Sequence, residues 1–160
     1  MLIGKQTWEF RNKPVIIGAA TVVGPEEGEG PLASDFDFTY DNLEIDEKTW
    51  EKAERKLLEH AASLSLVHAN ISKDQLSFFI GGDLMNQIIS ASFAARHLMV
   101  PYIGIFGACS TSMESLTVTD IERVACFNGS EVPVRLVVMA NNRVYTSFCA
   151  VDGCVRNFSQ

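Results

Sequence analysis

The feature that most constrains the fold is a series of short apolar runs separated by longer segments with helical spacing. Residues 15–23, 76–80 and 102–106 are apolar runs rich in β-branched and aromatic residues, and the first two stop at glycines. Such runs are typical of strands buried on both faces. The segments 47–69 and 88–98 carry apolar residues at helical spacing. Strands that alternate with helices predict an α/β fold whose mostly parallel sheet has helices on both faces.

The first long helix is expected to follow a long acidic surface loop. Asp46 has the side chain of a good N-cap, and Ile45 and Trp50 occupy the two positions of a hydrophobic staple. One face of the helix repeats apolar residues at helical spacing: Ala53, Leu57, Ala61 and Leu64. We therefore expect a helix that begins just after Asp46, fades near residues 69–70, and packs Trp50.

The last third of the sequence predicts one more helix and two more strands. Thr111 and Glu114 have the spacing of a capping box, so a helix should begin at Thr111 and end near residues 128–129. Residues 134–139 and 143–149 are apolar runs joined by an asparagine turn, which indicates an antiparallel pair. The expected order is β-α-β-α-β-α-β-β. We expect a domain over residues 1–140, followed by a divergent segment at 141–160 that adds an antiparallel edge strand.

Composition excludes several classes of protein. A chain of 160 residues suits one domain, and its net charge of −7 argues against nucleic-acid binding, which needs a basic face. The sequence has no Cys-x-x-Cys pair and no clustered histidines, so it predicts no metal site, and we expect no cofactor. It also has no apolar window of the kind that forms a transmembrane helix or a signal peptide. We expect a cytoplasmic chain with four free thiols, at Cys109, Cys126, Cys149 and Cys154.

Cys109 stands where chemistry often lies in α/β proteins, just beyond the carboxyl end of a strand. A helix is expected to begin within two residues, and its free N–H groups would stabilise a thiolate or a bound anion. Gly107 and Ala108 are small, so a ligand could approach the backbone closely. Ser110 and Thr111 add hydroxyl groups. The alternative is a buried cysteine with a structural role only.

The residues around this cysteine resemble a known family. Residues 107–115 resemble the cysteine turn of the thiolase-like superfamily. More narrowly, the chain resembles the stage V sporulation protein AD family, through motifs at residues 4–10, 23–32, 53–57, 82–87 and 95–98. The resemblance spans residues 1–116 in the expected order and degrades afterwards. The family continues through a second half that has no counterpart here, so we expect a fragment, or a truncated or frame-disrupted copy.

The resemblance implies a fold, a site and a role. The thiolase-like fold consists of two similar β-α-β-α-β-α-β-β halves, and this chain would be the first half. In thiolases and condensing enzymes the residue in the place of Cys109 is the acylated nucleophile, and its histidine or asparagine partners come from the second half. The sporulation family is implied to be non-catalytic and to bind dipicolinic acid in the equivalent cleft, here with Cys109, Ser110, Thr111 and Asn86. Its implied partners are dipicolinic acid, also as its calcium salt, and other stage V sporulation proteins at the inner membrane of the developing spore, where the chain would lie peripherally.

Three functions follow as alternatives. The first is a non-catalytic binder of dipicolinic acid that assists its uptake, and the second is a cysteine-dependent acyltransferase or condensing enzyme. The third is a truncated, non-functional copy. A nucleophilic cysteine needs a base, and no histidine is expected near Cys109. His97 is expected at the end of a helix, and His60 and His68 belong to the first long helix. Arg96 is the nearest cation for a diacid, or simply a charge at a helix end.

Association is a further expectation. The helix at 111–126 carries apolar residues on more than one side: Met113, Leu116, Val118, Ile121, Val124 and Ala125. In the complete fold this helix lies between the two halves, and a helix that is apolar on several faces is normally buried. We therefore expect the chain alone to form a homo-oligomer, most simply a homodimer, or to aggregate.

Overall fold

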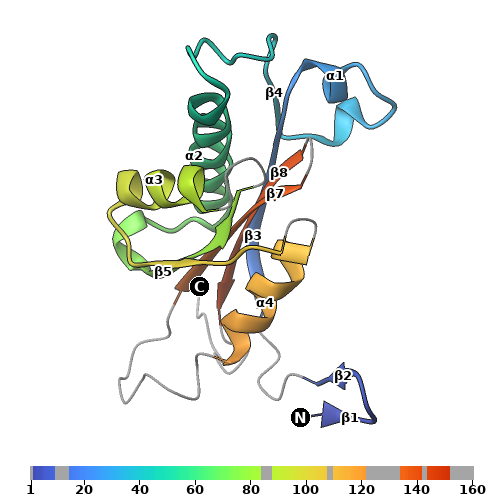
Figure 1. The fold of residues 1–160 in the computed structure, drawn as a ribbon, viewed down its shortest axis with the longest axis vertical. Coiled ribbons are helices and arrows are strands. Elements are labelled where there is room, and N and C mark those ends of the chain that lie inside the picture. The colour runs from blue at the N-terminus through green and yellow to red at the C-terminus, as the bar shows by residue number, and fades with distance from the viewer. Residues whose placement is uncertain are drawn as a thin grey trace.

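A mixed six-stranded sheet forms the framework of the chain (Figure 1). A computed structural model describes residues 2–9, 15–83, 88–107, 110–121, 134–141 and 144–151. The sheet has the order β4-β3-β8-β7-β5-β6. Its strands are β3 (Val15–Val23), β4 (Phe38–Thr39), β5 (Leu76–Gly82), β6 (Tyr102–Gly104), β7 (Val134–Asn141) and β8 (Val144–Val151). β1 (Leu2–Ile3) and β2 (Thr7–Trp8) form a separate antiparallel pair.

The sheet confirms the α/β class and the five expected strands. β5 pairs in parallel with both β6 and β7, and β3 pairs in parallel with β4. β8 runs antiparallel to β7, as expected, and also antiparallel to β3. The expected edge position for this last strand is wrong, because β8 lies between β3 and β7 inside the sheet. The segment after residue 140 therefore joins β3 and β4 to the rest of the sheet.

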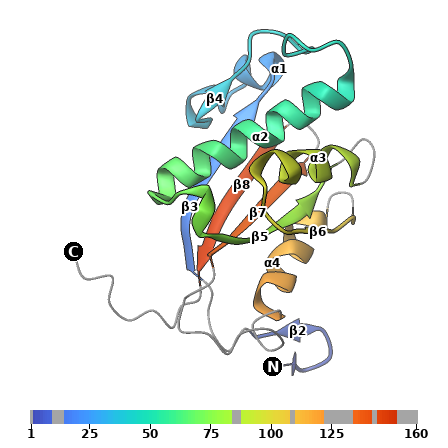
Figure 2. The same cartoon turned by 90° about the vertical axis from the view of Figure 1, so that its left-hand side faces the viewer.

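Helices cover both faces of the sheet, as the sequence predicts. α2 (Trp50–Ala69) and α3 (Ile89–Leu98) lie on one face, and α4 (Thr111–Ile121) lies on the other, in both views (Figures 1 and 2). The short helix α1 (Pro25–Gly28) and the single turns η1 (Ala33–Asp35) and η2 (Lys73–Gln75) lie in the connections. The expected end of α4 near residues 128–129 lies outside the described residues.

The described core lies between the sheet and the α2–α3 layer. Leu58 and Phe79 are fully buried there, with Val22, Ala61 and Ala94. A glycine lets the layers approach, since a Cβ at Gly18 would lie 2.7 Å from the Cβ of Ala69. The end of α2 therefore sits over Gly18. Val15 and Ile16 lie beyond that end and are half-exposed, so the expectation that β3 is buried along its whole length is wrong.

The start of α2 differs from the expectation. Thr49 is the N-cap, and its side chain accepts a hydrogen bond from the N–H of Lys52. Ile45 and Asp46 instead adopt left-handed backbone conformations, with φ of 54° and 59°. This turn buries Ile45 but leaves Trp50 53% exposed, so the predicted staple and the predicted packing of Trp50 are wrong. The end of the helix is as expected, with Asn70 as a left-handed C-cap.

Candidate functional site

The turn that precedes α4 is the candidate site, and the structure describes its two flanks. The chain leaves β6 at Gly104 and reaches Gly107, and it is described again from Ser110. Cys109 lies outside the described residues, together with Ala108. Asn86 lies outside them as well, in the segment 84–87 that follows β5. Of the four expected ligand-binding residues, Ser110 and Thr111 are therefore the two whose surroundings are known.

Hydrogen bonds across the turn hold these flanks together. The Gly107 N–H donates to the Thr111 hydroxyl oxygen at 3.0 Å, and the Ser110 N–H donates to the Gly107 carbonyl at 3.0 Å. The Ser110 hydroxyl lies 2.8 Å from the same carbonyl and also contacts the Glu114 carboxylate. Thr111 is buried, whereas Ser110 and Glu114 are exposed. The turn thus closes onto the first turn of α4 through its own polar groups.

Two glycines lie in close contact with other groups beside this turn. A Cβ at Gly107 would lie 2.1 Å from a carboxylate oxygen of Glu114 and 2.3 Å from the Ser110 hydroxyl. A Cβ at Gly82, at the end of β5, would lie 1.9 Å from the carbonyl oxygen of Ile105. These distances are far below van der Waals contact. The glycines therefore let β5, the chain after β6 and the start of α4 meet at one edge of the sheet.

The expected capping box at the start of α4 takes another form. Thr111 is the first residue of the helix, and its hydroxyl oxygen accepts from the upstream Gly107 N–H. Glu114 accepts from Ser110, four residues earlier, and not from Thr111. Sequence reasoning missed the role of Glu114 at the site. The i,i+4 spacing of Ser110 and Glu114 was the available signal.

The neighbouring strand end carries a buried carboxylate. Asp83 follows β5, is buried, and accepts a hydrogen bond from the Ala91 N–H at 2.9 Å. It thus caps α3 from eight residues upstream, whereas the N-cap position itself belongs to Ile88. The Tyr102 hydroxyl donates to the Gly81 carbonyl, and burial, with a smaller contribution from Asp83, raises the pKa of Tyr102 strongly. Asp83 and Tyr102 therefore fix the strand ends beside the turn.

Comparison with known proteins now decides the family. Residues 4–128 match the family described as stage V sporulation protein AD. The chain is 47% identical over 117 residues, 73% of its length, to stage V sporulation protein AD from Bacillus subtilis (strain 168). The chain belongs to the stage V sporulation protein AD family. It spans 35% of the length of that relative.

Solved structures show the same fold at low sequence identity. A type III pentaketide synthase from Neurospora crassa matches 90% of this chain with a TM-score of 0.65 and 9% identity. The 3-oxoacyl-[acyl-carrier-protein] synthase III from Aquifex aeolicus VF5 matches 91% of it with a TM-score of 0.59 and 16% identity. The chain covers 57% and 55% of these two structures. Family and fold together establish a thiolase-like α/β chain, as the sequence predicts.

The histidines of this family member lie away from the turn. His60 and His68 belong to α2 and His97 to α3, on the face of the sheet opposite α4 (Figure 1). His60 lies 2.9 Å from the Tyr40 hydroxyl, and burial lowers the pKa of His60. A ring nitrogen of His68 lies 2.7 Å from the Ala19 carbonyl. Arg96 is exposed in the last turn of α3, so neither it nor any histidine reaches the turn.

Two features are absent from the described part of the chain. It contains no cluster of histidine, cysteine, aspartate or glutamate side chains that could hold a metal ion. Within the same residues, no helix combines the length and the apolar character needed to cross a membrane. Cys126, Cys149 and Cys154 have no described side chains.

Proposed function

We propose that this chain is a non-catalytic sporulation protein whose cysteine turn binds dipicolinic acid and assists its uptake into the developing spore. The observation that carries the proposal is the amino-terminal end of α4, presented at the sheet edge by a tight glycine turn. Free N–H groups and the helix dipole favour a carboxylate there. Family membership supports the sporulation role, and the role in uptake follows from the resemblance described above.

The charge at the turn sets a condition on binding. Glu114 places a carboxylate against Ser110 in the first turn of α4, where the helix end would attract an anion. A dicarboxylate at this end would be repelled by Glu114 and would compete with it for the Ser110 hydroxyl. Calcium prefers carboxylate oxygens, so the calcium salt of dipicolinic acid would offset the repulsion. We therefore favour the calcium salt as the bound form.

Cysteine-dependent acyl transfer is the second candidate, favoured by the fold shared with the two synthases named above. A cysteine nucleophile needs an adjacent base or a strongly lowered pKa. All three histidines of this chain lie on the opposite face of the sheet, so none of them supplies the base that Cys109 would need. The third reading, a non-functional copy, differs from both in having no saturable ligand.

The proposed setting is cytoplasmic, with peripheral contact to other stage V sporulation proteins at the inner membrane of the developing spore. We also propose self-association through the face that carries α4. Met113 is 61% exposed on this helix, and Phe106 is half-exposed just before the turn. A second copy would cover these side chains.

Calorimetric titration with dipicolinate, with and without calcium, tests the binding proposal. We expect saturable binding to the chain, strengthened by calcium. Glu114→Gln should raise the affinity for dipicolinate alone about threefold, because it removes one exposed like charge. Gly107→Ala should weaken binding, because its Cβ would push the Ser110 hydroxyl aside, whereas Gly24→Ala, which meets no atom within 4 Å, should not. No saturable binding under either condition would overturn the proposal.

A further inference from the structure

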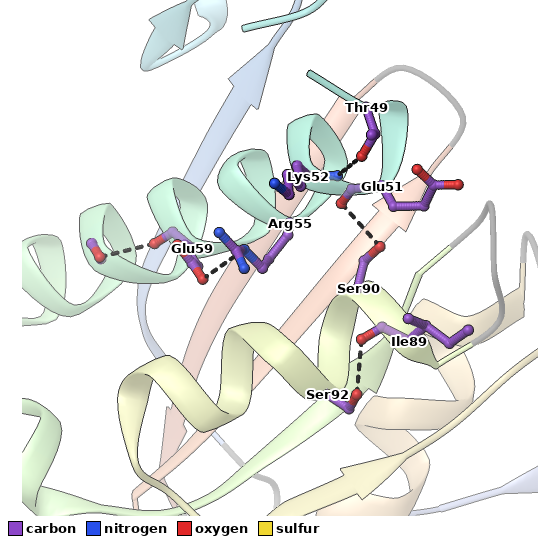
Figure 3. Close-up of polar contacts among 9 residues, drawn as sticks. Thr49, Glu51, Lys52, Arg55, Glu59, Ile89, Ser90 and Ser92 are labelled. Carbon is purple, nitrogen blue, oxygen red and sulfur yellow. Dashed lines mark hydrogen bonds and ion pairs between the residues drawn. The ribbon is translucent and has the colours of Figure 1, made fainter. Parts of the chain in front are cut away.

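A groove on the outer surface, far from the cysteine turn, has the composition of a second binding site. It is an open, shallow groove of about 430 Å³, lined by Arg55, Glu59, Phe93, Arg96, His97 and Met99. Arg55 and Glu59 come from α2, and the other four residues come from α3 and its C-cap. Figure 3 shows the two helices side by side, with Ser90 of α3 bonded to the Glu51 carbonyl of α2. The groove therefore belongs to a fixed helix pair.

The charge in the groove is opposite to that of the chain as a whole. Arg55 forms an ion pair with Glu59 at 3.4 Å (Figure 3), which balances one of the two guanidinium groups. Arg96 contributes the second guanidinium, and His97 contributes an imidazole that can donate a hydrogen bond. On a chain of net charge −7, this is a local excess of positive charge. A small anion would be attracted to it.

The groove also exposes apolar surface beside these cations. Phe93 is 48% exposed and Met99 is 76% exposed. An exposed aromatic ring offers a stacking surface, and a thioether makes favourable contacts with aromatic rings. A guanidinium group can pair with a carboxylate through two parallel hydrogen bonds. The combination suits a ligand with a flat apolar part and a carboxylate at its edge.

We propose that this groove binds a small aromatic carboxylate, with its carboxylate on Arg96 and its ring against Phe93 and Met99. The negative end of the α3 dipole disfavours an anion, and the basic residues Arg96 and His97 in the last turn of α3 offset this effect. The site is independent of the cysteine turn, because α3 and α4 lie on opposite faces of the sheet (Figure 2). It stands whether or not the turn binds dipicolinic acid.

Titration of the ¹⁵N-labelled chain with benzoate, followed by amide chemical shifts, tests the site. We expect saturable shifts confined to the end of α3 and the facing turns of α2. Arg96→Gln should weaken binding about fivefold through loss of a charge-assisted pair. Phe93→Ala should weaken it about threefold through loss of ring stacking. Lys52→Gln is the matched control, because it removes one exposed positive charge from α2 outside the groove, and it should leave the affinity unchanged.

The affinity for acetate and the positions of the amide chemical-shift changes distinguish this site from non-specific attraction of anions. Acetate has the carboxylate without the ring, and we expect it to bind at least threefold more weakly than benzoate. Equal binding of acetate, equal weakening by Lys52→Gln, or shifts that do not saturate would overturn the proposal. Shifts centred on α4 would also overturn it and would place benzoate at the cysteine turn instead. Circular dichroism of each variant checks that the helix pair stays folded.

Discussion

Gly82→Ala is the substitution that the structure predicts to be most costly near the site. The added Cβ would lie 1.9 Å from the Ile105 carbonyl oxygen and 3.4 Å from a methyl group of Thr111. The close contact is with backbone, which cannot rotate away, and moving it would stretch the hydrogen bond from the Ile105 N–H to the Gly81 carbonyl, now 2.9 Å. Overpacking costs about 1–3 kcal/mol and a lost hydrogen bond about 1 kcal/mol, so we expect a loss of about 3 kcal/mol.

Urea unfolding followed by circular dichroism measures this loss. With a slope of about 2 kcal/mol/M, 3 kcal/mol lowers the urea midpoint by about 1.5 M. Gly24→Ala is the control, since it has open space around the added Cβ and a φ of −84°, and it should change stability by less than about 1 kcal/mol. A Gly82→Ala midpoint within 0.3 M of the parent, taken as roughly the resolution of such fits, would refute the packing argument.

Three further predictions concern other parts of the chain. Burial lowers the pKa of His60 below its unfolded value of 6.5, so the unfolded state binds a proton more readily than the folded state, and stability should fall as pH drops below about 6.5. His60→Gln should weaken this pH dependence in urea unfolding measured at pH 5 to 8. An unchanged pH dependence in the variant would contradict this prediction. Incubation with acyl-coenzyme A should leave no acyl adduct on Cys109 that turns over, and mass spectrometry showing such an adduct would favour the enzyme. Met113→Glu should weaken self-association measured by sedimentation velocity, whereas a parent chain that sediments as a stable monomer of 17.6 kDa would disprove the association.

Local pattern predicted most of the fold. The runs at 15–23 and 76–80 became β3 and β5, since continuous apolar stretches bounded by glycine have few other stable arrangements. Helix ends with strong local signals, such as Asn70, were also predictable. The position of β8 was not, because strand order depends on which edges remain free after the rest of the sheet forms. The predicted start of α2 was wrong for a similar reason, because Ile45 reaches the core through a rare left-handed backbone conformation.

The sequence predicted the location of the site better than the side-chain contacts within it. The turn at residues 107–111 stands out by its glycine, its cysteine and its place between a strand and a helix. The contact of Glu114 with Ser110 was hidden, because capping rules pointed to Thr111 instead. The place of Asp83 after a glycine pair predicts a helix cap, and its carboxylate does accept from the Ala91 N–H of α3, although the N-cap position itself belongs to Ile88. To predict side-chain partners across a turn, the path of the backbone must be known as well as the sequence spacing.

The central claim is that dipicolinic acid binds at the cysteine turn, and protection of Cys109 from alkylation tests it most directly. The chain is treated with iodoacetamide with and without calcium dipicolinate, and peptide mass spectrometry gives the rate for each thiol. We expect the ligand to slow modification of Cys109 at least threefold, the ratio expected when about two thirds or more of the sites are occupied, and to leave Cys126, Cys149 and Cys154 unaffected. Equal rates at Cys109, at a ligand concentration that saturates the calorimetric signal, would contradict the claim.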